Sequence, residues 1–416
     1  MTSNMGEMAA ATHAFSVAPM MEYTDAHQRK LIRLLTVKSV LYTEMVTANA
    51  LVRTDNQERF LEADFTKEDP VVLQLGGSDP QMMADATKIA YNYGYRDFNV
   101  NCGCPSEKVA GAGCFGAALM LNPTLVADIA SSVSSVSGKP TTIKCRIGVD
   151  DDDSYEQLYD FVEAVSSRAK VDHFIIHARK ALLGGKFSPA DNRKIPPLKY
   201  HFVYQLSKDF PHIAFTLNGG VTTMAHTQSL LSGREEAACE ERVKVSGDGP
   251  WAKGKEKMQL AGVMVGRAIV DKPFHWGRVD SCLYGEPDQD LHRGDILERY
   301  SAYAQHVENT QGSRARRALV KPLLGLFAGE PNGKLFRQKL DTHLLDKQMK
   351  VRDVIMRASE VLREDVLLQK PSERYAWELK RDKLLAEQDA QKQEREGRGD
   401  LANSSKPDDH QAKTAV

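Results

Sequence analysis

Eight short apolar runs, each ending on a polar residue or a glycine, divide the first two thirds of the 416-residue chain. The runs begin at Phe15, Ser39, Pro70, Asp97, Pro140, His173, Ile213 and Ala261. Consecutive starts lie 24 to 48 residues apart, and a strand, a crossover helix and two loops need about 30 residues. The runs are therefore predicted to be the strands of repeated strand-helix units.

The stretches between the runs carry the signals of helices. Residues 78–94 begin with a serine before Pro80, place apolar residues three and four apart, and stop at Gly94. Apolar strands that alternate with amphipathic helices indicate a parallel sheet covered by helices. Eight units favour an α/β fold of the closed (β/α)8 TIM barrel type, with an open doubly wound sheet as the alternative. The first run continues as APMMEYTD without the glycines of a dinucleotide-binding turn, which favours the barrel.

Composition changes along the chain predict its organisation. An N-terminal extension (1–14) precedes a barrel domain (15–285), in which the charged segment 233–259 is predicted to be a surface insertion. Residues 286–371 have helical periodicity and predict a small all-helical domain. Residues 372–416 are densely charged and are predicted to be a disordered tail.

Charge and cysteine content exclude several classes of protein. With 55 Lys and Arg against 56 Asp and Glu, no overall field attracts nucleic acid, so a polyanionic partner needs a local patch. Six cysteines without a C-x-x-C pair argue against a disulfide framework and a structural zinc, and we expect no metal. No apolar run approaches the ~20 residues of a membrane span. We expect a monomer in the cytoplasm, with a plastid or mitochondrion as the alternative.

The predicted barrel places its functional groups where the strands end at their carboxyl side. Gly219 and Gly220 close the seventh run, and Gly266 with Arg267 closes the eighth. Open backbone N–H groups beside an arginine predict a phosphate site, although such glycines also simply turn chains. The other polar or flexible residues at these ends are Pro19, Met20, Glu44, Gln74, Asn99, Asn101, Cys104, Lys144, Arg146, His177, Arg179 and Asn218.

Two of these residues have several possible roles. Lys144 lies in an otherwise core-like run, so its ammonium needs an anion or the barrel mouth. It could form a Schiff base, balance the charge of a reduced cofactor, or pair with Glu44 or Asp150. His177 could be a satisfied core histidine or a contact to cofactor or substrate.

Cys104 opens a glycine-rich segment that runs from the fourth strand toward Met120. A thiol on such a loop can reach over the barrel mouth and act as an acid or a nucleophile. The alternative is a structural cysteine.

The motifs APMMEYTD, VLQLGG, NVNCGCPSEKV, FGAALM, IKCRIGVDD, LNGGV and GVMVGRA occur in this order within residues 14–280. HARKALL is followed by SPADNRKIPPLKY, and KPLLGLFAG lies in the helical region. Together they resemble the flavin-dependent tRNA-dihydrouridine synthases, and the HARKALL pair resembles their A-type subfamily.

The resemblance implies an FMN enzyme that uses NADPH to reduce the C5–C6 bond of uridines 20 and 20a in the tRNA D-loop. Cys104 would donate the proton to C5. Asn101, Arg193 and, more weakly, Lys321 would contact tRNA, and Ala190 departs from the basic residue of other members, so one phosphate contact is expected to be missing. The implied FMN contacts are Pro19, Met20, Met21, Gln74, Lys144, His177, Asn218, Gly219, Gly220, Gly266 and Arg267.

Two other functions fit many of these residues. An FMN barrel that reduces a free pyrimidine or a small enone would use the same cofactor contacts. A non-catalytic tRNA-binding protein would bind RNA without flavin. Because the total charge is neutral, the enzyme's own grip on tRNA would come from patches such as Arg314, Arg316, Arg317 and Lys321, which could also be a solvated face.

Overall fold

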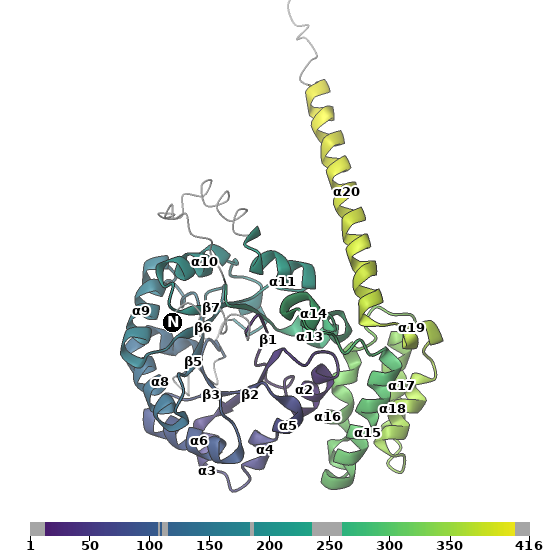
Figure 1. Ribbon diagram of the computed structural model, residues 1–416, viewed down its shortest axis with the longest axis horizontal. Coiled ribbons are helices and arrows are strands. Elements are labelled where there is room, and N and C mark those ends of the chain that lie inside the picture. The colour runs from purple at the N-terminus through teal and green to yellow at the C-terminus, as the bar shows by residue number, and fades with distance from the viewer. Residues whose placement is uncertain (1–12, 107–108, 110–114, 184–186, 235–259, 404–416) are drawn as a thin grey trace, which may run out of the picture. The chain divides into compact units, whose positions relative to one another are not determined.

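The computed structural model describes residues 13–106, 109, 115–183, 187–234 and 260–403. Eight parallel strands close into a barrel in chain order (Figure 1). The predicted TIM barrel is therefore confirmed, and the open sheet is excluded. The strands are β1 (Phe15–Val17), β2 (Val40–Thr47), β3 (Val71–Gly76), β4 (Phe98–Cys102), β5 (Thr142–Arg146), β6 (His173–His177), β7 (Ala214–Asn218) and β8 (Gly262–Val265).

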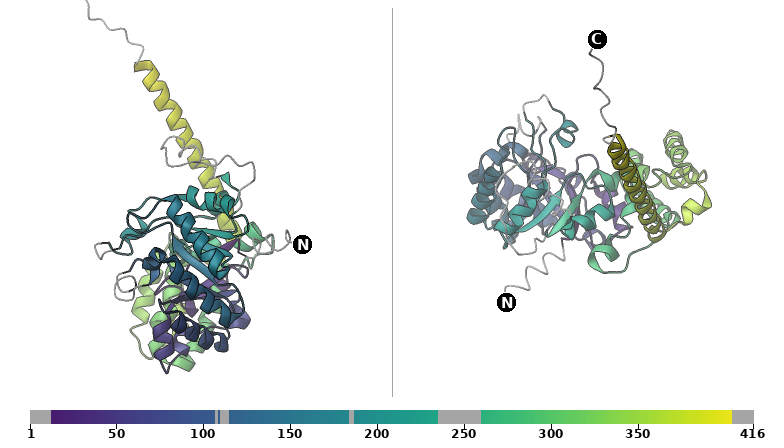
Figure 2. Two further views of the ribbon diagram at one scale, coloured as in Figure 1. Left: turned by 90° about the vertical axis from the view of Figure 1, so that its left-hand side faces the viewer. Right: turned by 90° about the horizontal axis from the view of Figure 1, so that it is seen from above.

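Helices surround the strands, as Figures 1 and 2 show. They are α2 (Ala26–Arg33), α3 (Ala48–Arg53), α4 (Glu58–Leu61), α5 (Phe65–Glu68), α6 (Pro80–Tyr93), α8 (Pro123–Ser137), α9 (Tyr155–Ala169), α10 (Tyr200–Asp209), α11 (Met224–Leu231), α13 (Arg267–Asp271) and α14 (Val279–Tyr284). The short helical turns η1 (Gly116–Leu121), η2 (Asp191–Arg193) and η3 (Pro273–Trp276) complete this part.

Local sequence explains where helix α6 begins and ends. The side chain of Asp79 accepts a hydrogen bond from Met82 N at 2.8 Å, and Pro80 occupies the first turn. Gly94 ends the helix with φ at 135°, a conformation that a side chain would strain. The helix predicted over residues 78–94 is confirmed.

Helices after the barrel pack against it. They are α15 (Arg293–Gln311), α16 (Arg316–Val320), α17 (Gly333–His343), α18 (Val351–Ser359) and α19 (Glu364–Leu368), with the turns η4 (Ser313–Ala315) and η5 (Lys321–Gly325). Leu31 and Leu35 near α2 share one hydrophobic cluster with Ile296, Tyr300 and Val354. Burying this common surface stabilises both parts together, and residues up to Pro371 form one compact unit.

The charged C-terminal segment contains one long helix. Residues 371–403 form helix α20 (Pro371–Asn403), which lies almost wholly in a second unit that begins at Ser372. Nothing here tests the expectation of disorder for the tail as a whole, which stays a prediction. Ion pairs one turn apart, such as Arg374 with Glu378 at 2.9 Å, favour a helix.

Some predicted segments lie outside the described residues. These are nearly all of the N-terminal extension, the insertion from residue 235 to 259, and the tail beyond residue 403. Within the described ranges, no helix is both long and apolar enough to span a bilayer. The same ranges contain no group of three His, Cys, Asp or Glu side chains placed to hold a metal ion.

Candidate active site

A chain of buried amides crosses the barrel at strands β3 and β4. Asn101 Nδ2 donates to Gln74 Oε1 at 2.8 Å, and Gln74 Nε2 donates to Asn99 Oδ1 at 2.8 Å. Asn99 in turn donates to Thr142 Oγ1 at 2.8 Å. Each amide is fixed by its neighbour, so the orientations of Gln74 and Asn101 are set before any ligand arrives.

The backbone around Cys104 is held from both sides. Asn101 Oδ1 accepts hydrogen bonds from Gly103 N at 3.1 Å and Cys104 N at 3.0 Å. On the other side, Ala117 N donates to Cys104 O at 2.9 Å. The Cys104 side chain is half-buried and forms no disulfide. The loop therefore presents its thiol from a fixed backbone position.

Arg146, at the end of β5, ties three loops together. Its Nε donates to Gly103 O at 2.9 Å, and its Nη1 donates to Lys180 O at 2.9 Å and Asn192 O at 3.1 Å. Burial lowers the pKa of Arg146 to about 10. Sequence analysis placed this residue at the barrel mouth but gave it no role. The only sequence signal for Arg146 is its position at the end of the IKC run. Its three acceptors are carbonyls of loops that are distant in sequence, so the pattern around Arg146 does not reveal them.

Lys144 bridges strands β5 and β7. Its Nζ donates to Asn218 Oδ1 at 3.1 Å, and Asn218 Nδ2 donates to Met264 O at 2.8 Å. Burial lowers the pKa of Lys144 to about 8, and the charge of Arg146 adds to this, whereas interactions with Cys145 and then Cys104 oppose it. Cys104 and Lys144 therefore lie within electrostatic reach of each other.

Lys144 does not pair with Glu44 or Asp150 in the described structure, so that possible role is wrong. The Glu44 carboxylate accepts from Glu22 N, and Asp150 Oδ1 accepts from Leu183 N at 2.9 Å. A buried ammonium whose direct partner is an uncharged amide remains available for an anionic group.

His177 is not the satisfied core histidine of the alternative interpretation. Its Nδ1 is buried and has no hydrogen-bond partner in the structure. Burial, together with Arg146 and Lys144, lowers the pKa of His177 well below its ordinary value, so the ring is neutral. A buried ring nitrogen without a partner marks a place where a ligand can complete the bonding.

The glycines after β7 leave little room for side chains. Gly219 and Gly220 have φ values of 115° and 73°, which favour glycine. A Cβ at Gly220 would lie 2.5 Å from Leu198 Cδ1, and one at Gly219 would lie 3.3 Å from His177 Nε2. Tyr200 Oη, which sequence analysis missed, donates to Gly219 O at 2.6 Å. The backbone conformation at both positions, and the packing of Leu198 against Gly220, thus require glycine beside His177.

Two arginines lie close together beyond these glycines. Gly266 precedes α13, whose first residue Arg267 is exposed. Arg193, in η2, has a pKa lowered by burial and by the charge of Arg267, and its buried Nε has no partner. Neither guanidinium forms an ion pair within the described structure. Two neighbouring guanidinium groups without an ion-pair partner predict that an anion binds between or beside them.

The loop after β1 carries Pro19, Met20 and Met21. Thr24 Oγ1 accepts from Met20 N at 2.9 Å, and Thr24 N donates to Met20 O at 3.0 Å. The Met20 side chain packs against the cluster that contains Met264, whereas Pro19 is half-buried and Met21 is exposed. A Cβ at Gly266 would lie 3.5 Å from Met20 Sδ, so this loop lies beside the predicted phosphate site.

Lys321 reaches the same loop from the helical part. Its Nζ donates to Glu22 O and lies 4.8 Å from the centroid of the Tyr23 ring. The basic patch predicted around it is smaller than expected, because Arg316 is buried, pairs with Glu308 and donates to Asp346 O at 3.2 Å. Arg314 and Arg317 are exposed. Arg316 is thus a structural residue and not part of an RNA-binding face.

Comparison with known proteins identifies relatives that match most of the chain. Residues 16–237 match the family model described as dihydrouridine synthase (Dus). The chain is 40% identical over 326 residues to the tRNA-dihydrouridine(20/20a) synthase of Shigella flexneri, covering 78% of this chain and 86% of that protein. It is also 40% identical over 337 residues to the Synechocystis sp. protein of the same name, covering 81% of this chain and 91% of that one. A solved 2-naphthoyl-CoA reductase complex (9% identity, TM-score 0.43, 66% of this chain and 50% of that chain) is too distant to support an argument.

Proposed function

Because the chain belongs to the dihydrouridine synthase family, we propose that it is a tRNA-dihydrouridine(20/20a) synthase that uses FMN and NADPH. Members of this family are flavin-dependent oxidoreductases that act on a CH–CH group of tRNA uridines. The observation that carries the proposal is the placement of Cys104, Lys144 and His177 at the carboxyl ends of the neighbouring strands β4, β5 and β6. The strand registers pair Asn101 with Lys144, Arg146 with His177, and His177 with Asn218 just before the glycines after β7.

The residues present fit FMN. Gly219, Gly220, Gly266 and Arg267 would hold its phosphate, since glycine N–H groups are not shielded by a side chain of their own and Arg267 is exposed. His177 has a buried nitrogen that awaits a partner. The remaining contacts would come from side chains that face the barrel mouth, namely Pro19, Met20, Met21, Gln74, Lys144 and Asn218.

When bound, FMN supplies a hydride to C6 of uracil. Lys144 would hold its ammonium against an anionic ring, and burial at this place strengthens that attraction. Cys104 would keep a proton on Sγ and deliver it to C5 of the uracil. Asn101 and Arg146 would hold the backbone that carries this thiol.

The substrate uridine must leave its stack to reach a barrel mouth, so the protein must hold the surrounding RNA. Arg193 is the strongest candidate contact, because its Nε is buried without a partner beside the mouth. Lys321 and the exposed Arg314 and Arg317 would add phosphate contacts. Asn101 has one amide hydrogen left for such a contact, since its Oδ1 and its other N–H are used.

The experiment that tests the proposal uses the purified full-length protein. We expect the absorbance spectrum of a bound flavin and the formation of dihydrouridine when unmodified tRNA and NADPH are added. A flavin-free protein that binds tRNA, or a flavoprotein that reduces free uridine as readily as tRNA, would contradict it. Position mapping in tRNA from a deletion strain tests the choice of uridines 20 and 20a. A monomeric, cytoplasmic enzyme stays a prediction, which sedimentation and cell fractionation test.

A further inference from the structure

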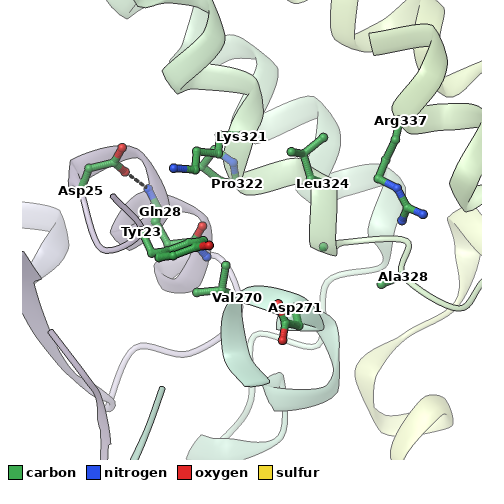
Figure 3. A pocket seen from close by; sticks show the side chains of 11 residues that line it. Tyr23, Asp25, Gln28, Val270, Asp271, Lys321, Pro322, Leu324, Ala328 and Arg337 are labelled. Atoms are coloured by element: carbon green, nitrogen blue, oxygen red, sulfur yellow. Dashed lines mark hydrogen bonds between the residues drawn. The ribbon is translucent and has the colours of Figure 1, made fainter. Parts of the chain in front are cut away.

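A cavity of about 390 Å³ opens beside the loop after β1 (Figure 3). Its walls come from three segments that are distant in sequence. Tyr23 and Gln28 belong to the loop and α2, Asp271 belongs to α13, and Leu324 and Arg337 belong to η5 and α17. None of the proposed FMN contacts lines this cavity, and it is thus separate from the proposed flavin site.

The apolar part of the wall suits a flat ring. The Tyr23 side chain is 42% exposed and the Leu324 side chain is 37% exposed. Unstacked nucleic-acid bases bind on aromatic side chains in this way. The volume lies within the range of sites for small organic groups.

A buried donor in the wall lacks a partner. Gln28 is only 2% exposed, and its Nε2 has no hydrogen bond in the structure. Its backbone N–H already donates to Asp25 Oδ1 at 2.8 Å, which caps α2. A buried amide N–H without an acceptor costs free energy, and a carbonyl or ring nitrogen of a bound base would relieve that cost.

Charged side chains line the cavity on several sides. Arg337 is half-buried and forms no ion pair or hydrogen bond in the described part of the chain, while Lys321 also lines the cavity. The exposed carboxylate of Asp271 lies on the floor (Figure 3), and Asp25 lines the cavity too. Cations suit a phosphate, and Asp271 suits the hydroxyl groups of a ribose.

We propose that this cavity binds a second unstacked nucleotide of the tRNA, near the uridine that is reduced. The inference rests on the proposed function. Tyr23 is three residues after Met20 in the loop proposed to line the flavin, so one RNA strand can reach both places. Lys321 Nζ donates to Glu22 O, in the loop that carries Met20 and Met21. A phosphate that attracts Lys321 would therefore lie close to this loop.

The test compares two cavity variants with a matched control. Arg337→Ala removes the half-buried cation, and Leu324→Trp fills the space. Lys334→Ala removes an exposed cation from the same helix α17, outside the cavity. The dissociation constant for unmodified tRNA is measured by filter binding, and NADPH oxidation without tRNA reports whether each flavoprotein is intact.

Both cavity variants should raise the dissociation constant for tRNA by about fivefold or more. Arg337→Ala removes a charge-assisted contact to phosphate, and Leu324→Trp fills the space of a base whose stacking contributes roughly 1–3 kcal/mol. NADPH oxidation should stay near the wild-type rate, and Lys334→Ala should bind tRNA as the wild type does. Intact cavity variants that bind tRNA like Lys334→Ala would overturn the inference. A second measurement asks whether UMP protects Arg337 from a guanidine-modifying reagent. If it does, and the cavity variants still bind tRNA like Lys334→Ala, the occupant is a free nucleotide and the inference is overturned.

A crosslink identifies the occupant directly. p-Benzoylphenylalanine in place of Leu324 should crosslink tRNA at a D-loop nucleotide other than the reduced uridine. Crosslinks only outside the D-loop, or equal crosslinking from position 334, would contradict the inference. Binding and crosslinking are independent of turnover, so a wild-type protein that forms no dihydrouridine refutes the proposed function alone. A productive enzyme whose cavity variants match the control refutes the cavity site alone.

Discussion

The side chain of Asn101 holds the backbone of Cys104, because Asn101 Oδ1 accepts the Cys104 N–H at 3.0 Å. The same oxygen accepts Gly103 N at 3.1 Å, and the amide nitrogen is tied to Gln74 Oε1 at 2.8 Å. The resemblance to known synthases implied that Asn101 contacts tRNA. The contacts within the protein give it a second task, which is to position the loop that carries the proposed proton donor.

Replacement of Asn101 should separate catalysis from binding. Asn101→Ala frees the Gly103 and Cys104 N–H groups, so kcat for dihydrouridine formation should fall about 10- to 100-fold. The dissociation constant for tRNA should change by less than about threefold, because this residue has only one hydrogen to offer RNA. Asn101→Asp keeps an acceptor for both N–H groups and should recover part of kcat. Equal losses in kcat and in tRNA affinity would indicate that Asn101 acts mainly on RNA.

Arg146 should matter for stability as well as for turnover. Arg146→Ala leaves the carbonyls of Gly103, Lys180 and Asn192 without their donor, and we expect a loss of roughly 2–4 kcal/mol in the free energy of unfolding. Denaturant unfolding measures this. Arg168, which is 54% exposed on α9, supplies the control, since Arg168→Ala should cost less than about 1 kcal/mol. Equal stabilities of the two variants would refute the role assigned to Arg146.

The pKa of Lys144 predicts how FMN binding depends on pH. Burial lowers this pKa to about 8 in the protein without ligand, so the ammonium is present below that pH and lost above it. Affinity of the flavin-free protein for reduced FMN, whose ring is anionic, should therefore fall as pH rises from about 7 to 9. Titrations of protein fluorescence with reduced FMN measure it. Lys144→Gln should bind reduced FMN more weakly and show no such fall, and a wild-type affinity that is constant over this range would contradict the assignment.

A methyl group at Gly220 should expel the cofactor. Its Cβ would lie 2.5 Å from Leu198 Cδ1, and φ is 73°. Gly138 provides a matched control, because its φ is 71° but a Cβ there meets nothing within 4 Å. Both Ala variants should lose about 1 kcal/mol of stability through backbone strain, and Gly220→Ala should lose more because Leu198 and Tyr200 must shift. Only Gly220→Ala should be purified with much less bound FMN. Equal flavin content in the two variants would place the phosphate elsewhere.

The barrel could be predicted from sequence because strand and helix signals are local. Functional groups of such a barrel lie where its strands end, which predicted Lys144, His177 and the glycines after β7 at one mouth. The strand register that pairs His177 with Asn218 agrees with this placement. The partners of Arg146 could not be predicted, since its three acceptors are carbonyls of separate loops.

Charge patterns proved less informative than strand ends. Arg316 reads as surface charge in sequence but pairs with Glu308 in a buried setting. The dense charge after Ser372 could not show that pairs at helical spacing, such as Arg374 with Glu378, accompany a helix in part of the tail. In both cases the meaning of a charge depends on which residue lies opposite it after folding, and composition does not carry that information.

The most direct measurement compares wild type with Cys104→Ala in a single turnover. Each enzyme is reduced by NADPH without oxygen and mixed with unmodified tRNA, and dihydrouridine is followed over time. Cys104→Ala should bind FMN and tRNA normally and accept reduction at the wild-type rate. It should form dihydrouridine at least about 100-fold more slowly, because it lacks the proton donor. Dihydrouridine formation at the wild-type rate by Cys104→Ala would contradict the account.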